Sequence, residues 1–450
     1  MRLPRIVIAG TSSNSGKTAA TCALLSLLKR RGISAKAFKC GPDYIDPMFH
    51  KAVSGTECTN LDPFFCDADL LKALICDDPD KQIAVIEGVM GYYDGTSQDG
   101  TDNSTFTVAH QTDTPVILIM DAKGSAASLM AAIEGFLHFV PESHIKGVLF
   151  NRMTPKSYSS IANLIQDRFK GAVVPVGFIP LLPEDCRIPS RHLGLVTASE
   201  IKDLAEKLEK TADLCSPTID VDAILSIADK APDLESAAPA IKRYGRINLA
   251  VAYDNAFCFY YDSTFRMLKR MGASLRFFSP LADETVPHNT DGLLIGGGYP
   301  ELYTEKLESG IHAKESILGA VTSGMPTIAE CGGFQYLGKE LDGRKMCGIL
   351  GHSSFKTDRL VRFGYITLTS HKDGLLGPSG TMLKAHEFHY WDSTDNGDSF
   401  SAIKPNGKEW ECAVLSDTLY AGYPHLFLPA NRGALEAFYK KCLEYKEIRQ

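Results

Sequence analysis

The chain has 450 residues, of which 44% are hydrophobic and 22% charged, and its formal net charge is −7 at pH 7. This length exceeds what one hydrophobic core usually holds, so two domains are expected, and the interspersed acids and bases argue against a nucleic-acid partner. The twelve cysteines include no CxxC pair, which favours a reducing cytoplasm over disulfides or a zinc site. Because no apolar run has the length of a signal peptide or a membrane span, the sequence predicts a cytoplasmic protein without a membrane partner.

A buried-strand pattern at residues 6–9 leads into a loop that ends in Gly16-Lys17-Thr18, and a helical pattern follows. The backbone amides of such a loop bind phosphate, while the Lys17 ammonium neutralises phosphate oxygens and the Thr18 hydroxyl can reach Mg²⁺. Gly10 lies six residues before Gly16, one more than the usual spacing, so a purely structural loop stays open as an alternative. The ATP-binding residues expected from this loop are Gly10, Thr11, Asn14, Ser15, Gly16, Lys17 and Thr18.

Polar residues follow the next two predicted strands, residues 35–39 and 83–86. The first strand is followed by an acid-rich turn, and the second ends at Glu87. Open α/β sheets bind ligands at the carboxyl ends of their strands, and P-loop enzymes hold Mg²⁺ from an acid such as Glu87. A solvated turn and a helix cap are the plainer interpretations. The residues gathered after the first strand are Lys39, Asp43, Tyr44 and Asp46.

Three more strand patterns, at residues 116–120, 147–150 and 173–178, are separated by helical patterns such as residues 125–140. This alternation predicts a parallel sheet with crossover helices, and hence an ATP-binding domain over residues 1–215. A local basic cluster suits carboxylates or phosphates but is equally typical of a solvated loop. Its members are Arg187, Arg191 and His192.

Residues 216–245 read mainly as a linker, although residues 219–228 have the pattern of a short helix. Strand patterns resume at residues 247–252, so a second domain over residues 246–450 is expected. The predicted fold class is therefore α/β, with two domains.

In the second domain, a strand pattern at residues 327–329 leads to Cys331 with two glycines directly behind it. A strand, a tight glycine turn and a helix make a nucleophile elbow, which presents the thiol to a cleft. An earlier glycine turn, containing Gly297 and Gly298, could supply the amide donors of an oxyanion hole. The alternative is that Cys331 is an ordinary buried side chain.

A thiol nucleophile needs a base, because a free cysteine is mostly protonated at neutral pH. Four downstream histidines are candidates, and their spacing does not choose among them. They are His352, His386, His389 and His425.

The phosphate loop resembles that of the dethiobiotin synthetases, and the second half resembles class I glutamine amidotransferases. Nearly the whole chain resembles the cobyrinate a,c-diamide synthase family through the motifs at residues 39–46, 87–91, 191–195, 296–301 and 386–389.

The resemblance implies roles for individual residues. Cys331 would be the glutaminase nucleophile and His425 its base. Phe427 stands where most class I enzymes have an acid, as in the corrinoid amidases, so another group must orient His425. Lys39 and Asn151 would join the ATP site, with Asn151 reading adenine.

The implied reaction is amidation of the a and c acetates of cobyrinate in cobalamin biosynthesis, with ATP and L-glutamine as co-substrates. Mg²⁺ would be held by Thr18, Asp46 and Glu87, and the anionic tetrapyrrole by Asp43, Tyr44 and Tyr92. A homodimer and a covered ammonia path between the domains are further expectations. The alternatives are hydrogenobyrinate, nickel-sirohydrochlorin or other corrin side chains as acceptors, or a P-loop ATPase switch with a degenerate amidotransferase domain.

Overall fold

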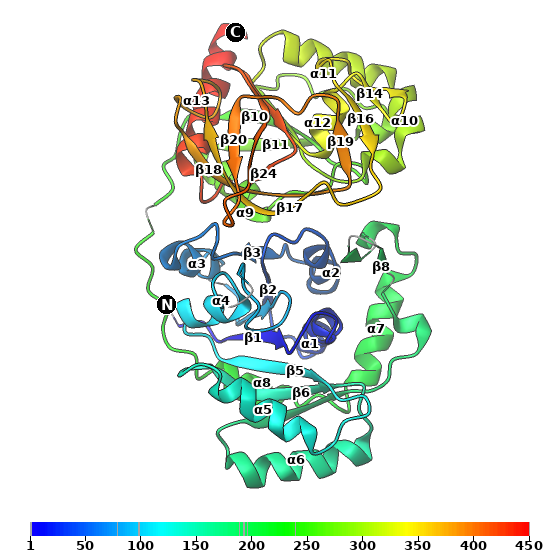
Figure 1. The fold of residues 1–450 in the computed structure, drawn as a ribbon, viewed down its shortest axis with the longest axis vertical. Coiled ribbons are helices and arrows are strands. Elements are labelled where there is room, and N and C mark those ends of the chain that lie inside the picture. Colours follow the sequence, from blue (N-terminus) through cyan, green and yellow to red (C-terminus); the bar gives the residue numbers. More distant parts are fainter. Residues whose placement is uncertain are drawn as a thin grey trace. The chain divides into compact units, whose positions relative to one another are not determined.

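A computed structural model describes residues 2–78, 80–97, 100–188, 190–191, 194–195, 197–238 and 240–449. It divides the chain into two compact units, Met1–Ala238 and Pro239–Gln450. In Figure 1 the first unit runs from blue to green and the second from green to red.

The first unit is built from alternating strands and helices. Its strands are β1 (Arg5–Gly10), β2 (Ala35–Cys40), β3 (Thr59–Leu61), β4 (Ile83–Glu87), β5 (Val116–Asp121), β6 (Ile145–Asn151), β7 (Val174–Ile179), β8 (Ser190–Arg191) and β9 (Gly194–Leu195). Its helices are α1 (Lys17–Arg30), α2 (Ile45–Ser54), α3 (Ala68–Ile75), α4 (Thr105–Gln111), α5 (Ser128–His138), α6 (Pro155–Phe169), α7 (Leu204–Cys215) and α8 (Val221–Ala228), with 3₁₀ turns η1 (Glu184–Cys186) and η2 (Ala198–Glu200).

Seven of these strands form one parallel sheet in the order β3-β2-β4-β1-β5-β6-β7. Strands β1 and β4 are buried along their whole length, as expected for a parallel sheet covered on both faces. Helix α1 packs against α2, α7 and α8, and α3 packs against α4. In Figure 1, α1, α2 and α7 lie on one side of this sheet, and α3 and α4 lie on the other. The prediction of a parallel sheet with crossover helices is confirmed.

The segment expected as a linker, residues 216–245, begins with structure that belongs to the first unit. Ile219 pairs with Gly177 in an isolated bridge, and α8 follows at residues 221–228. The Ile227 side chain packs so close to Gly147 that a Cβ on this glycine would lie 3.0 Å from it. Apolar burial therefore extends the first unit beyond residue 215, to Ala238.

The second unit contains more strands than the sequence patterns predict. They are β10 (Ile247–Ala252), β11 (Ala273–Phe278), β12 (Gly292–Ile295), β13 (Thr327–Glu330), β14 (Glu340–Leu341), β15 (Arg344–Lys345), β16 (Ser353–Lys356), β17 (Arg362–Ser370), β18 (Met382–His389), β19 (Trp391–Ser393), β20 (Phe400–Ile403), β21 (Glu409–Cys412), β22 (Val414–Leu415), β23 (Leu419–Gly422) and β24 (His425–Leu426). The helices are α9 (Asp262–Met271), α10 (Thr304–Ser309), α11 (Ile311–Thr322), α12 (Gly332–Leu337) and α13 (Arg432–Arg449), with 3₁₀ turns η3 (Pro280–Ala282) and η4 (Pro300–Leu302).

A six-stranded sheet in the order β11-β10-β12-β13-β23-β22 forms the centre of this unit, and only β22 runs antiparallel to its neighbour. A second sheet, β21-β20-β17-β18-β24, is antiparallel throughout. Buried side chains from both sheets, among them Ile328, Leu368 and Leu426, share one core cluster. The second sheet matters for function because β18 and β24 carry three of the four candidate histidines.

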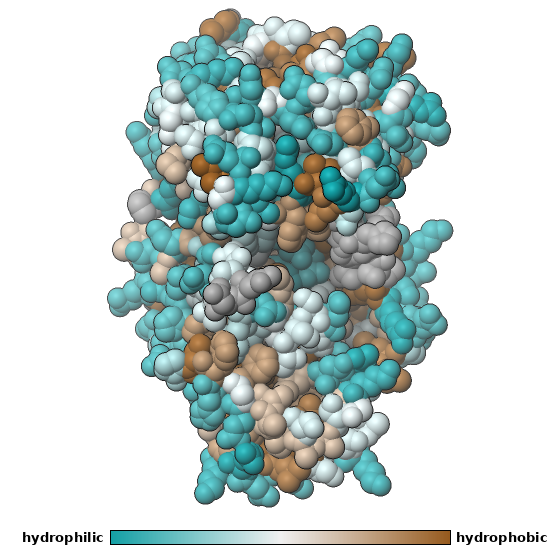
Figure 2. All heavy atoms as spheres, in the orientation of Figure 1, coloured by the Kyte–Doolittle hydropathy of each residue, from teal (hydrophilic) through white to brown (hydrophobic). Residues whose placement is uncertain are grey.

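On the face drawn in Figure 2, hydrophilic side chains cover most of each unit and hydrophobic ones occur in small separate groups. Among the described residues, no helix has both the length and the apolar composition to cross a membrane.

Candidate active sites in the two units

Cys331 lies at a sharp turn between β13 and α12. Its φ of 50° and ψ of −100° are strained for a residue with a Cβ. The turn is held by the Cys331 amide, which donates to the Gly422 carbonyl oxygen at 2.8 Å. A Cβ on Gly333 would overlap the carbonyl oxygen of Ile295, so only glycine lets α12 start this close to β12. This geometry is that of a nucleophile elbow.

Gly297 brings the cysteine and one histidine together. A Cβ on Gly297 would overlap the Cε1 atom of His425 and lie 3.4 Å from the Cβ of Cys331. The next residue, Gly298, has a φ of 153°, and its amide nitrogen would lie 3.3 Å from a Cβ on Gly332. The two glycines proposed for the oxyanion hole therefore border the elbow and the His425 ring.

The other three candidate histidines have different surroundings. His352 stacks on Phe334 at 4.0 Å between ring centroids, and His389 stacks on Tyr423 at 4.0 Å. His386 stacks on His425 at 5.0 Å, and burial lowers its pKa to about 3. Each of these contacts gives the ring a packing role, whereas His425 alone among the four lies against the bare backbone of Gly297.

Burial dominates the electrostatics of this site. It raises the pKa of the Cys331 thiol above its ordinary value, and it lowers the pKa of His425 well below the ordinary value for histidine. Both groups are therefore neutral at pH 7 in the resting site. Attack by sulfur then requires proton transfer to the imidazole during the reaction, which is general-base catalysis.

Glu330, the residue before the nucleophile, is a site residue that the sequence reasoning missed. Its Oε1 atom accepts a hydrogen bond from the Leu426 amide at 3.0 Å, and its Oε2 atom lies 3.9 Å from Nδ1 of His425. Burial raises the Glu330 pKa to about 8. Phe427, at the position of the usual acid, is fully buried and packs edge-to-face on Tyr261. An acid directly at the end of β13 was the sequence signal that could have drawn attention to Glu330.

In the first unit, the phosphate loop joins β1 to α1. Gly16 has a φ of 102° at the start of α1, and a Cβ on Gly10 would overlap the Ser15 hydroxyl. The Lys17 ammonium donates to the Ser12 carbonyl at 3.0 Å, inside its own loop. Burial, with the nearby Lys39, lowers the Lys17 pKa to about 8. Of the other loop residues, Thr11 donates its amide to Ile119 at 3.1 Å and Asn14 has a φ of 60°.

The three residues expected to hold Mg²⁺ lie together beside this loop. The Thr18 hydroxyl donates to Glu87 at 2.8 Å and lies 3.4 Å from Asp46. The Lys39 ammonium donates to Glu87 at 2.9 Å and forms a short ion pair with Asp46. A hydroxyl and two carboxylates are an oxygen-only donor set, which fits Mg²⁺.

His50 also belongs to this group, and the sequence reasoning missed it. Its Nε2 atom lies 2.6 Å from the second Glu87 oxygen, and both side chains are fully buried. Although burial opposes ionisation, Lys39 and His50 hold the Glu87 pKa below its ordinary value. His50 follows Asp46 by four residues in α2, so both lie on one helix face. This spacing was the available signal.

Asn151 contacts the phosphate loop. Its amide donates to the Ser15 carbonyl at 2.9 Å, and a Cβ on Gly16 would overlap it. The residue therefore supports the phosphate loop from the end of β6. Its expected contact with adenine stays a prediction.

The residues expected to bind the macrocycle differ in exposure and in hydrogen-bond partners. Asp43 accepts from the amides of Ile45 and Asp46 at 2.8 and 3.2 Å, and a third of its side chain is exposed. Tyr44 directly precedes α2 and is nearly buried. Tyr92 is fully buried, and its hydroxyl donates to the Ser143 carbonyl at 2.6 Å. This burial gives Tyr92 a place in the core of the first unit, and its contact with the macrocycle stays a prediction.

Part of the basic cluster expected at residues 187–192 lies outside the described residues. Arg187 is exposed, whereas His192 and the side chain of Arg191 are not among the described parts of the chain.

Comparisons with known proteins agree with this division of the chain. The CobQ/CobB/MinD/ParA nucleotide binding domain matches residues 6–196, and the CobB/CobQ-like glutamine amidotransferase domain matches residues 248–432. The chain is 37% identical to the cobyrinate a,c-diamide synthase of Thermoplasma volcanium, over 100% of both chains. It is 37% identical to that of Listeria monocytogenes serotype 4b (95% of this chain, 97% of the relative) and 33% identical to that of Priestia megaterium (99% and 98%). Because this identity extends over nearly the full length of each relative, the chain belongs to the cobyrinate a,c-diamide synthase family.

Proposed function

We propose that the chain is a glutamine-hydrolysing ligase that amidates the a and c acetate carboxylates of cobyrinate at the expense of ATP, in cobalamin biosynthesis. The observation that carries the proposal is the pairing, in one chain, of an elbow cysteine beside His425 with a phosphate loop beside Asp46 and Glu87. The corrinoid substrate follows from the names of the relatives. The cysteine and its histidine would release ammonia from glutamine, and the phosphate-loop site would activate a carboxylate to receive this ammonia.

The first unit would activate the carboxylate. A carboxylate carbon is a poor electrophile, so the γ-phosphoryl group of ATP is transferred to a carboxylate oxygen, giving an acyl phosphate and ADP. Ammonia then attacks the acyl carbon and phosphate leaves. Lys17 and the loop amides bind the phosphates and orient the transferring group.

Thr18, Asp46 and Glu87 would hold Mg²⁺ in this unit, which supplies charge neutralisation on the phosphates. The Lys39 ammonium contacts both carboxylates and so offsets their mutual repulsion. Asp43 and Tyr44, which lie at the start of α2 next to these groups, are the proposed contacts to the macrocycle.

The second unit would release ammonia from glutamine. His425 takes the thiol proton as the Cys331 sulfur attacks the side-chain amide carbon, and the amides of Gly297 and Gly298 stabilise the oxyanion. His425 then gives the proton to the leaving nitrogen, which departs as ammonia. Water hydrolyses the remaining thioester to glutamate and restores the thiol.

We further propose that Glu330 positions His425. With Oε1 fixed by the Leu426 amide, Oε2 faces Nδ1 of His425 at 3.9 Å. A proton on Nδ1 directed at this carboxylate leaves Nε2 as the basic nitrogen for the thiol, the arrangement found in nucleophile–histidine–acid triads. Glu330 thereby supplies the carboxylate that most class I enzymes have at the position of Phe427.

The test is amidation of cobyrinate, hydrogenobyrinate and nickel-sirohydrochlorin in parallel, with ATP and either glutamine or ammonia, followed by mass spectrometry. Wild type should add two amides to cobyrinate. Cys331→Ala should lose amidation with glutamine and retain it with ammonia, because only the release of ammonia needs the thiol. If the enzyme prefers another macrocycle, that macrocycle replaces cobyrinate as the assigned substrate. ATP hydrolysis without amidation of any macrocycle would overturn the proposed function in favour of an ATPase switch.

A further inference from the structure

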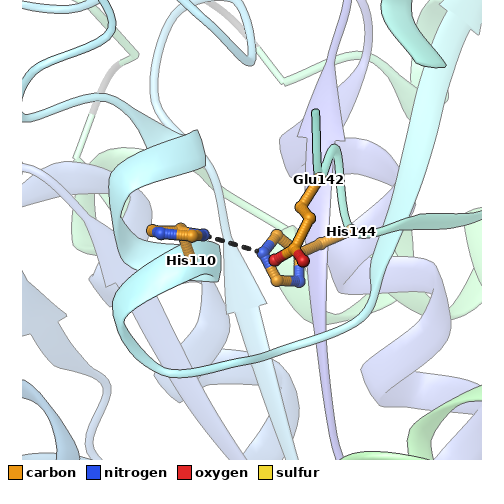
Figure 3. A group of neighbouring side chains, drawn as sticks. All are labelled: His110, Glu142 and His144. Atoms are coloured by element: carbon orange, nitrogen blue, oxygen red, sulfur yellow. Dashed lines mark hydrogen bonds between the residues drawn. The ribbon is translucent and has the colours of Figure 1, made fainter. Parts of the chain in front are cut away.

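Two histidines and a glutamate meet on the surface of the first unit, away from the phosphate loop. His110 lies near the end of α4, while Glu142 and His144 lie in the segment between α5 and β6. Figure 3 shows the three side chains converging, with a hydrogen bond between the two rings. One ligand atom of each residue lies within 4.8 Å of those of the other two.

The spacing of the two ring nitrogens matches that of metal ligands. Nδ1 of His110 lies 3.1 Å from Nε2 of His144. Two nitrogens that each lie about 2.0–2.1 Å from one ion at cis octahedral or tetrahedral angles are about 2.8–3.4 Å apart. One divalent ion can therefore bind both rings when Nδ1 of His110 and Nε2 of His144 are unprotonated, and its binding displaces the proton of the hydrogen bond between them.

Asp113 supplies the outer contact that metal-binding histidines commonly have. Its Oδ1 atom lies 3.6 Å from Nδ1 of His144. A carboxylate on this side favours the tautomer with the proton on Nδ1, so the Nε2 lone pair is directed at His110. Such a carboxylate orients the ring and increases its basicity as a ligand.

The surroundings give a cation both access and attraction. The three side chains line a surface pocket of about 430 Å³, together with Asp113, Asp233 and Glu235. Lys72 is the one lysine among the pocket's lining residues, and no arginine lines it. Acids therefore outnumber fixed positive charges, which raises the local concentration of cations.

We propose that His110, Glu142 and His144 bind a divalent first-row transition-metal cation such as Zn²⁺, Co²⁺ or Ni²⁺. Two imidazoles and one carboxylate select this class over Mg²⁺, which takes oxygen ligands. The bound ion links α4 to the segment that leads into β6. The site is separate from the proposed amidation chemistry, and its test reads metal binding rather than catalysis.

The test is equilibrium dialysis of the full chain, without a histidine tag, against Co²⁺ and Zn²⁺ in excess Mg²⁺, which occupies the oxygen-donor site at Thr18. Wild type should bind one equivalent more than His110→Gln or His144→Gln, whose affinity should fall by at least about tenfold. Asp113→Asn should weaken binding by about tenfold, because it removes only the outer contact. The matched control is His138→Gln, an exposed histidine at the end of α5, which should bind like wild type.

Two further measurements keep the result interpretable. Co²⁺ should raise the Tm of wild type and of His138→Gln but not that of the His110 and His144 variants, because binding stabilises only the folded site. The visible spectrum of the Co²⁺ form should show nitrogen and oxygen ligation without a thiolate charge-transfer band. Equal metal binding by wild type and both site variants would overturn the proposal. A thiolate band that persists in all of these variants would overturn it too and would assign the metal to cysteine.

Discussion

Replacement of Glu330 by glutamine removes the charge beside His425 and little else. Gln retains the size of the side chain and an oxygen that can accept from the Leu426 amide. During catalysis His425 becomes an imidazolium, and the Glu330 oxygen lies 3.9 Å from Nδ1. Two unit charges at this separation attract by about 4 kcal/mol at an effective dielectric constant of about 20. Loss of this attraction predicts a fall of about 10³-fold in the glutaminase kcat above about pH 8, where the carboxyl is ionised.

The pH dependence gives a second signature. Because burial raises the Glu330 pKa to about 8, only about a tenth of this carboxyl is ionised at pH 7. The wild-type glutaminase rate should therefore rise through about pH 8 and then level off, and this limb should be absent from Glu330→Gln.

As the pH rises, the ionisation of Glu330 should increase the glutaminase rate but decrease the stability of the folded protein. The native state holds the Glu330 proton more tightly than the unfolded state, so the contribution of Glu330 is fully present below its ordinary pKa of 4.5 and is lost as the pH rises to about 8. The shift corresponds to a penalty of about 5 kcal/mol above that pH. Glu330→Gln does not ionise, so its Tm should gain on that of wild type as the pH is raised through this window.

The assay is the initial rate of glutamate formation from about pH 6 to 10 for wild type, Glu330→Gln and Glu315→Gln, an exposed acid in α11 that serves as control. Amidation with ammonia should be the same in all three proteins, since it does not use His425. An unchanged limb near pH 8 in Glu330→Gln, with a rate within a few-fold of wild type, would refute the positioning role.

Two other substitutions test the remaining geometry. Gly297→Ala places a methyl group against His425 and Cys331, so the glutaminase kcat should fall by at least about 10²-fold while amidation with ammonia persists; a normal kcat would place the oxyanion donors elsewhere. His50→Gln weakens a buried contact to the Glu87 carboxylate, which should lower the free energy of unfolding by about 1.5–3 kcal/mol. Thermal denaturation measures this loss against His138→Gln, and equal Tm values in the two variants would show that His50 does not stabilise Glu87.

Local sequence patterns were enough to predict the two motifs and the strands that carry them. The phosphate loop and the Cys331 elbow each consist of a buried strand, a glycine turn and a helix that follow one another directly in the chain, so their geometry depends on neighbours in sequence. The acids at residues 46 and 87 were predictable as partners because parallel strands end at one edge of a sheet. The second sheet of the later domain was not predicted, because the buried positions of its strands alternate irregularly and the strands pair over long distances in sequence.

The sequence by itself determined that this is a two-domain α/β protein with a phosphate loop and an elbow cysteine, and resemblance to a family pointed to His425. Only the tertiary structure placed Glu330 against His425, His50 against Glu87 and the Tyr92 hydroxyl inside the core. Periodicity reports which face of an element is apolar, but not which distant element packs there. Contacts between side chains far apart in sequence depend on how whole sheets and helices pack. The contact between Glu330 and His425 is one of them.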